Sequence, residues 1–166
     1  MNVTETLEQI LKSYTAYYDI EKEPASSMFA AKAAFHSHDE QFFLVKNAKL
    51  GETESNEYVF FAAENCLDTD LLNTLDQAAW EEGISLVKPH SCHRNTDITL
   101  VIVSDRITPD AAALIPKRKH YKSYHWGFQG WSHYRLVVLE VSSGRAIYNR
   151  HGRELKKLFD SIIKSF

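Results

Sequence analysis

The sequence predicts an α+β fold in which a mixed, mostly antiparallel sheet is flanked by helices, with one helix at each end of the chain. Three features indicate this class: apolar residues repeat at helical spacing near both termini, short alternating segments follow the first helix, and an apolar, β-branched segment lies in mid-chain. The chain has 166 residues, 44% apolar and 25% charged, a composition typical of one compact domain. We therefore expect residues 1–166 to form a single domain.

The first predicted element is an amphipathic helix over residues 3–18. Asn2 and Glu5 have the spacing of an N-cap residue and its capping-box partner, and Pro24 separates this helix from the segments that follow. Three strands are predicted next, at residues 29–35, 42–45 and 58–61, with a polar turn at 36–40 and a loop at 51–56 between them. Such short connections favour an antiparallel meander.

The second half of the chain predicts alternating helices and strands. A helix capped by Asp68 or Thr69 is expected to end near Gly83. Residues 98–104 are nearly all apolar or β-branched, which predicts a central strand covered on both faces. The remaining predicted elements are a short helix from Thr108 to Pro116, a hairpin of residues 136–141 and 146–148 turning at Ser143-Gly144, and a helix over residues 155–166.

The order helix, three strands, helix, strand resembles the common core of the restriction-endonuclease-like superfamily over roughly residues 3–104. The resemblance implies an Asp near the start of the second strand and an acidic-x-Lys triplet on the third, which bind a metal and assist hydrolysis. Asp39 lies at the first position, whereas the third strand, residues 58–64, ends in Glu64 and contains no such triplet. Asp39 and Glu64 are therefore the candidate catalytic residues. The chain also resembles small bacterial proteins of unassigned function, which implies no mechanism.

Charge is distributed unevenly along the chain. Residues 1–116 contain 8 Lys and Arg against 19 Asp and Glu, a net charge of −11, whereas residues 117–166 contain 11 against 3, a net charge of +8. Such asymmetry indicates either a surface for nucleic acid or another acidic partner, or two faces that neutralise each other within the fold or between subunits.

Residues 117–135 combine basic and aromatic side chains, and no acidic residue occurs between Asp110 and Glu140. Basic side chains neutralise phosphates and aromatic rings stack on bases, a combination used in single-strand binding. The candidate ligand-binding residues are Lys117, Arg118, Lys119, Lys122, Trp126, Trp131 and Arg135. The alternation is also typical of a buried strand or of a long hairpin packed on the core, with Gly127 and Gly130 in its turn, and a small ligand or a protein partner is a further alternative.

Metals, cofactors and membranes have no clear signature in the sequence. Histidines gather at residues 36–39 and 90–93, the second group around Cys92, but neither group has the spacing of a metal site. We therefore expect no metal and no cofactor. No export signal and no apolar window approaching 18 residues is present, so we expect a cytoplasmic protein that does not enter membranes.

Three hypotheses about function follow. The first is a non-enzymatic binding or interaction domain that uses residues 117–135 and has nucleic acid or an acidic partner as its ligand. The second is a metal-dependent hydrolase on a degenerate nuclease-like core, using Asp39, Glu64 and a histidine. The third is a homo-oligomer in which the acidic part of one subunit contacts the basic part of another.

Overall fold

The computed structural model describes the backbone of residues 1–24, 26–40 and 52–166, and side chains outside positions 37–53. The helices are α1 (Val3–Tyr14), α2 (Thr69–Leu86), α3 (Pro109–Leu114) and α4 (Lys156–Lys164), with short 3-10 helices η1 (Ile115–Lys117), η2 (His125–Gly127) and η3 (His151–Leu155). The strands are β1 (Asp19–Lys22), β2 (Ala31–Glu40), β3 (Glu52–Leu67), β4 (His93–Ile107), β5 (Tyr121–Ser123), β6 (Trp131–Glu140) and β7 (Arg145–Tyr148).

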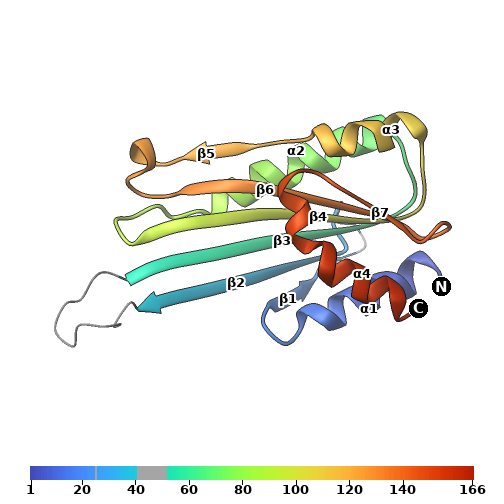
Figure 1. Ribbon diagram of the computed structural model, residues 1–166, viewed down its shortest axis with the longest axis horizontal. Coiled ribbons are helices and arrows are strands. Elements are labelled where there is room, and N and C mark those ends of the chain that lie inside the picture. The colour runs from blue at the N-terminus through green and yellow to red at the C-terminus, as the bar shows by residue number, and fades with distance from the viewer. Residues whose placement is uncertain (25, 41–51) are drawn as a thin grey trace.

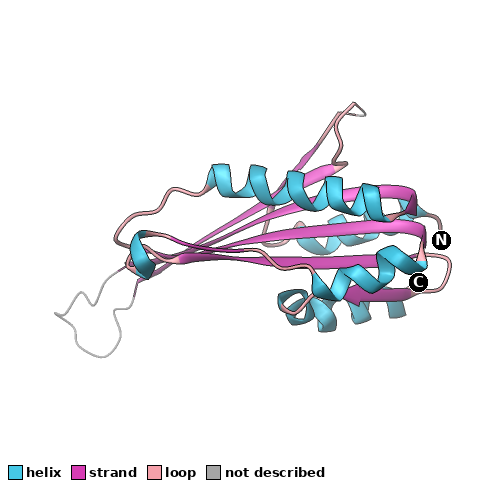
Figure 2. Cartoon of the chain, turned by 90° about the horizontal axis from the view of Figure 1, so that it is seen from above, coloured by secondary structure: helices cyan, strands magenta, loops and turns pink. Residues whose placement is uncertain are grey.

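These strands form one mixed sheet in the order β1-β2-β3-β4-β6-β5, with β7 paired to the far end of β6 (Figure 1). The pairs β3–β4 and β4–β6 are parallel and the other four pairs are antiparallel. Helices α2 and α3 cover one face, and α1 and α4 cover the other, as the view along the sheet shows (Figure 2). The predicted α+β class with a helix near each terminus is confirmed.

Strand β4 lies in the middle of the sheet and is buried on both faces, as predicted. Ile98, Leu100 and Ile102 pack toward α2 and α3. Val101 and Val103 pack toward α1 and α4. A strand covered on both faces needs apolar residues at successive positions, which is why its sequence shows no alternation.

Local capping signals place the helix starts where the sequence predicts them. The Asn2 side chain accepts a hydrogen bond from the Glu5 backbone N–H at 2.8 Å, and the Glu5 carboxylate accepts one from the Asn2 N–H at 3.1 Å. Asp68 caps α2 by accepting from Leu71 N–H at 2.8 Å, and Thr108 caps α3. Helix α1 ends at Tyr14, four residues before the predicted boundary.

Two predictions about the first strands are wrong. Residues 36–40 continue β2 instead of turning, and β3 already begins at Glu52, so residues 52–56 are strand and not loop. The reason is cross-strand pairing: Phe35 opposes Glu57 and Glu40 opposes Glu52, so the ladder of backbone hydrogen bonds holds polar residues extended. The meander consists of β1, β2 and β3, and the predicted strand at 42–45 lies outside the described residues.

The predicted stop of α2 at Gly83 is also wrong, because the helix continues to Leu86. A Cβ atom at position 83 would lie 2.6 Å from Cγ2 of Ile98. Gly83 therefore serves the close approach of α2 to β4 and does not end the helix. Within the described part of the chain, no helix combines the length and apolar character needed to cross a membrane.

Candidate functional site

Residues 117–135, called the basic-aromatic arm below, form one edge of the sheet. The arm leaves α3 through η1, runs along β6 as strand β5, reverses at η2 and returns as β6 (Figure 1). Strands β5 and β6 pair antiparallel, with Tyr121 opposite His133 and Ser123 opposite Trp131. The arm thus contains both an exposed edge strand and the first half of a core strand.

The turn at η2 presents two large aromatic rings to solvent. Trp126 is 96% exposed and Phe128 is 85% exposed. His125 and Trp126 adopt left-handed backbone angles, with φ of 47° and 60°, a conformation that costs of order 1 kcal/mol or more in residues other than glycine. Such strain persists only where surrounding contacts enforce it, which marks the turn as a candidate functional feature.

Backbone contacts around the turn enforce its shape. The N–H of Tyr124 donates to the Gly130 carbonyl at 2.9 Å, and the N–H of Gln129 donates to the Tyr124 carbonyl at 3.1 Å. Gly130 has φ of +87°, and a Cβ atom there would lie 2.2 Å from the Arg94 carbonyl oxygen. The turn of residues 124–130, called the aromatic turn below, therefore packs against the start of β4.

The other aromatic and basic candidates occupy different environments. Trp131 is half-buried on β6, with its ring centroid 6.5 Å from that of His133. Lys122 is exposed and lies 5.5 Å from the centre of the Tyr124 ring, whereas Arg135 points into a cluster of carboxylates described below. The structure therefore leaves Trp131 and Arg135 apart from the solvent-facing part of the arm.

A cationic pocket lies beside the start of β5. Its volume is about 710 Å³, and none of the described residues that line it carries a carboxylate. The lining residues are Pro116, Lys117, Arg118, Lys119, His120, Tyr121, His133, Asn149, Arg150 and His151. We call this cavity the basic pocket. It contains the Lys117–Lys119 run that the sequence singled out, and adds Arg150 and His151 from a distant part of the chain.

Contacts to α2 fix the backbone that carries the pocket's lysines. The Arg118 guanidinium donates to the Asn73 side-chain oxygen. His120 Nε2 lies 2.7 Å from Oδ2 of the buried Asp76, and the Trp80 ring stacks on the His120 ring with centroids 5.0 Å apart. Lys117, which precedes Arg118, and Lys119, which lies between Arg118 and His120 in the chain, remain exposed.

Two histidines meet at the pocket wall. The ring centroids of His133 and His151 are 4.3 Å apart, and the Tyr121 ring lies 5.3 Å from that of His133. Burial, together with the neighbouring His151, lowers the pKa of His133. A bound anion would favour the protonated form of the His133 imidazole.

A second polar cluster is centred on Arg135 of β6 and includes side chains from β3, β4 and η3. Its guanidinium lies 2.8 Å from Glu57, 2.9 Å from Asp97 and 2.7 Å from Glu154. The Thr99 hydroxyl donates to Glu57 at 2.8 Å, and the Tyr18 hydroxyl donates to the other Glu57 oxygen. The sequence analysis missed these carboxylates, because 78 residues separate Glu57 from Arg135 and no local pattern links them.

The pKa of Asp97 gives this cluster a measurable signature. Burial, only partly offset by Arg135, raises the pKa of Asp97 from 3.8 to about 6. Between these values the folded state binds more protons than the unfolded state, so this group's contribution is fully present below pH 3.8 and is lost as the pH rises through 6. The loss corresponds to about 3 kcal/mol.

We expect Asp97→Asn to remove this pH dependence. Urea denaturation of the parent and the variant at pH 4 and pH 7 measures it: the parent should lose about 2 kcal/mol more than the variant between the two values, because at pH 4 the unfolded-state carboxyl is already partly ionised. Asp19→Asn, in β1 outside the cluster, is the control and should follow the parent. Equal pH profiles for parent and Asp97→Asn would contradict the burial argument.

The structure does not bring the two candidate catalytic carboxylates together. Asp39 opposes Thr53 near one end of β3, while Glu64 lies eleven residues further along that strand, opposite Ser104. At about 3.3 Å per residue, this separation is about 36 Å. Burial raises the pKa of Glu64, but no metal-binding group of three or more side chains was found among the described residues.

The two histidine groups of the sequence do meet, through polar intermediaries. His36 Nδ1 lies 2.7 Å from Oδ1 of Asn56, whose amide donates to Glu54 at 2.9 Å. The other Glu54 oxygen lies 2.6 Å from His90 Nε2. His36 and His90 are therefore the two ends of a hydrogen-bonded chain that crosses β2, β3 and the loop before β4.

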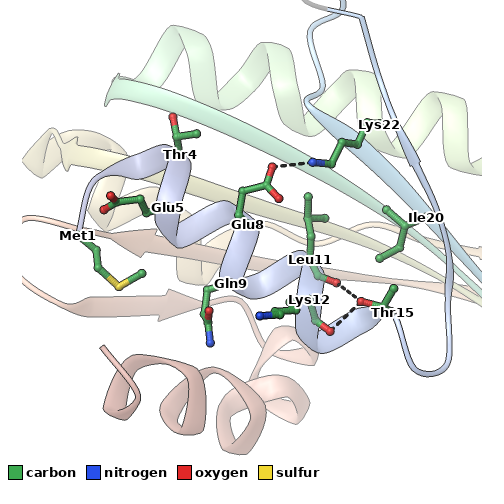
Figure 3. Close-up of a pocket in the computed structure, with 10 residues that line it drawn as sticks. All are labelled: Met1, Thr4, Glu5, Glu8, Gln9, Leu11, Lys12, Thr15, Ile20 and Lys22. Atoms are coloured by element: carbon green, nitrogen blue, oxygen red, sulfur yellow. Dashed lines mark hydrogen bonds and ion pairs between the residues drawn. The ribbon is translucent and has the colours of Figure 1, made fainter.

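Another pocket, of about 630 Å³, lies between α1 and β1 (Figure 3). Several of its polar groups contact one another. Lys22 pairs with Glu8 at 2.7 Å, and the Thr15 hydroxyl contacts the carbonyls of Leu11 and Lys12. Its lining carries both acidic and basic side chains, whereas the ionisable residues that line the basic pocket are lysines, arginines, histidines and one tyrosine.

The fold and the site together define an α+β protein with a cationic pocket and an exposed aromatic turn at one edge of its sheet. Residues 2–161 match the family described as Domain of unknown function (DUF8052), and the chain belongs to this family. Comparisons with curated proteins and with solved structures found no match. They give no support to the resemblance to the restriction-endonuclease-like superfamily.

Proposed function

We propose that the protein is a single-domain, non-enzymatic binding protein whose ligand is single-stranded nucleic acid, held by the basic-aromatic arm. The observation that carries this proposal is the aromatic turn, where Trp126 and Phe128 are almost fully exposed on a strained, anchored backbone. Packing in the core does not account for these rings, because they lie in solvent. Stacking on unpaired bases accounts for them, because every base offers a π-face to such a ring.

Charge along the arm supports the same ligand. Lys117, Lys119 and Lys122 are exposed on the segment that leads to the aromatic turn. Basic side chains beside stacking rings are the elements from which single-strand grooves are built, since the lysines neutralise phosphates while the rings hold bases. The alternative role for such lysines is to protect an edge strand from pairing with another chain, which leaves the exposed rings unexplained.

The proposal includes a cytoplasmic location, and the resemblance to small bacterial proteins favours a bacterial cell. Nucleic acid is accessible there, and the free Cys66 and Cys92 suit a reducing compartment. The principal alternative is a homo-oligomer in which the basic part, residues 117–166, contacts the acidic part of another copy. Its signature is a molecular mass that falls as salt is added.

The salt dependence of binding tests the proposal. Fluorescence anisotropy with single-stranded DNA and RNA should give a log Kd that rises linearly with log salt. The double variant Lys117→Gln, Lys119→Gln should flatten that slope by about 1.4, since each phosphate contact of a single strand contributes about 0.7. Lys12→Gln is the matched control, because Lys12 is exposed on α1, far from β5 (Figure 1).

Two outcomes contradict the proposal. One is a parent protein that binds neither polymer at low salt. The other is an equal flattening of the slope by Lys12→Gln, which would show that binding reflects general charge and not the arm. Light scattering over the same salt series detects the homo-oligomer directly.

A further inference from the structure

We propose that the basic pocket binds a terminal phosphomonoester, so that the ligand of the arm is a single strand with a phosphorylated end. This inference rests on the proposed function and adds to it the chemical class of the strand's end. The pocket lies where the arm begins, and Tyr121 belongs to both: it lines the pocket and is the first residue of β5.

The composition of the pocket favours a dianion over a single backbone phosphate. Lys117, Lys119 and Arg150 contribute three cationic side chains, and no carboxylate is found among the described lining residues. A phosphomonoester near neutral pH carries a charge of about −1.5 to −2 on three terminal oxygens, so it can engage several donors at once. A phosphodiester inside a strand offers one charge and two such oxygens.

The volume of the pocket and its exposed tyrosine favour the end of a strand as the ligand. Its volume of about 710 Å³ exceeds what a phosphate group needs and lies within the range of small-molecule sites. It therefore has room for a terminal nucleotide. The Tyr121 ring is 60% exposed beside His133 and offers a face on which the base of that nucleotide can stack.

The walls of the pocket are held in place before any ligand arrives. Asn149 is buried and uses both ends of its amide: its nitrogen donates to the carbonyls of Arg118 and Tyr134, at 2.9 and 3.0 Å. Its oxygen accepts from the N–H groups of Leu136 and Gly152, at 2.8 and 2.7 Å. This one side chain thus joins the lysine-bearing segment to β6 and η3.

The same anchor holds Arg150 and His151, which directly follow Asn149, in the lining that they share with Lys117 and Lys119. Pre-positioned walls reduce the ordering that binding requires. Arginine can contact two phosphate oxygens with its planar fork, and Arg150 is exposed, without a carboxylate partner among the ion pairs of the described residues. Arg118, by contrast, is already engaged with Asn73.

The test compares three oligonucleotides of one sequence, ending in a 5′-phosphate, a 3′-phosphate or hydroxyl groups only. One phosphorylated end should raise affinity at least about tenfold over the hydroxyl-ended strand. Arg150→Gln should bring that ratio close to one, while Lys12→Gln should keep it. Thermal melting verifies that Arg150→Gln folds, and Lys119→Gln is the second variant expected to reduce the ratio.

The outcomes separate this inference from the proposed function. Equal affinity for the three strands overturns the inference and leaves the proposed function in place. Failure of every strand to bind overturns the proposed function. Direct binding of a 5′-mononucleotide, measured by titration calorimetry, would in that case assign the pocket to free phosphomonoesters and would also overturn a strand-end role. A preference that survives in both Arg150→Gln and Lys119→Gln shows that the end is recognised elsewhere.

Discussion

Replacing Arg135 by Met should lower the free energy of unfolding by about 3–5 kcal/mol at pH 7. Glu57 is 4% exposed and Asp97 is 9% exposed, and each is within 3 Å of the Arg135 guanidinium. Without the guanidinium, two buried carboxylates face each other with no cation between them, a situation that costs more than loss of the contacts themselves. Urea denaturation at pH 7 measures the change.

Two further variants make the Arg135 prediction specific. Arg150→Met removes an exposed arginine and should change stability by less than about 0.5 kcal/mol. Adding Glu57→Gln to Arg135→Met should recover part of the loss, because the two positions are in direct contact and are coupled. A loss below about 1 kcal/mol for Arg135→Met would show that the cluster is solvated and not buried.

The double variant Trp126→Ala, Phe128→Ala should weaken single-strand binding by about 2–6 kcal/mol, at about 1–3 kcal/mol for each stacked ring. Both rings lie in solvent, so their removal takes no contact from the core. The free energy of unfolding should therefore stay within about 0.5 kcal/mol of the parent. Anisotropy with single-stranded RNA and urea denaturation together measure the two quantities.

An exposed aromatic residue elsewhere is the control for the aromatic turn. Tyr17 is 79% exposed in the turn after α1, and Tyr17→Ala should alter neither binding nor stability. Unchanged affinity in the double variant would remove the observation on which the proposed function depends. A stability loss of about 3 kcal/mol or more would instead show that the rings pack against the protein in solution.

Elements with local causes were predictable from the sequence. The caps at Asn2, Asp68 and Thr108 depend on side chains within three residues of the N–H groups that they accept from. The burial of β4 follows from its continuous run of apolar residues. The turn between β6 and β7 follows from Gly144, whose φ is +66°. These features need no knowledge of what lies across the sheet.

Features decided by partners far along the chain were not predictable. Residues 36–40 are polar and have no strand pattern, yet pairing with residues 52–56 extends them. Gly83 has the signature of a helix end, but its role is set by Ile98 on a neighbouring strand. In both cases a tertiary contact outweighs a local preference of smaller magnitude.

In the candidate site, the concentration of basic and aromatic residues in residues 117–135, and the absence of acidic residues there, can be read from the amino-acid sequence. Which of these residues face solvent depends on the packing of the folded chain. Trp126 lies exposed in a turn in which Gly130 packs on the Arg94 carbonyl. Arg135, in contrast, forms ion pairs with three carboxylates from β3, β4 and η3 and is half-buried. Composition is a property of one segment, but exposure depends on the segments that pack against it.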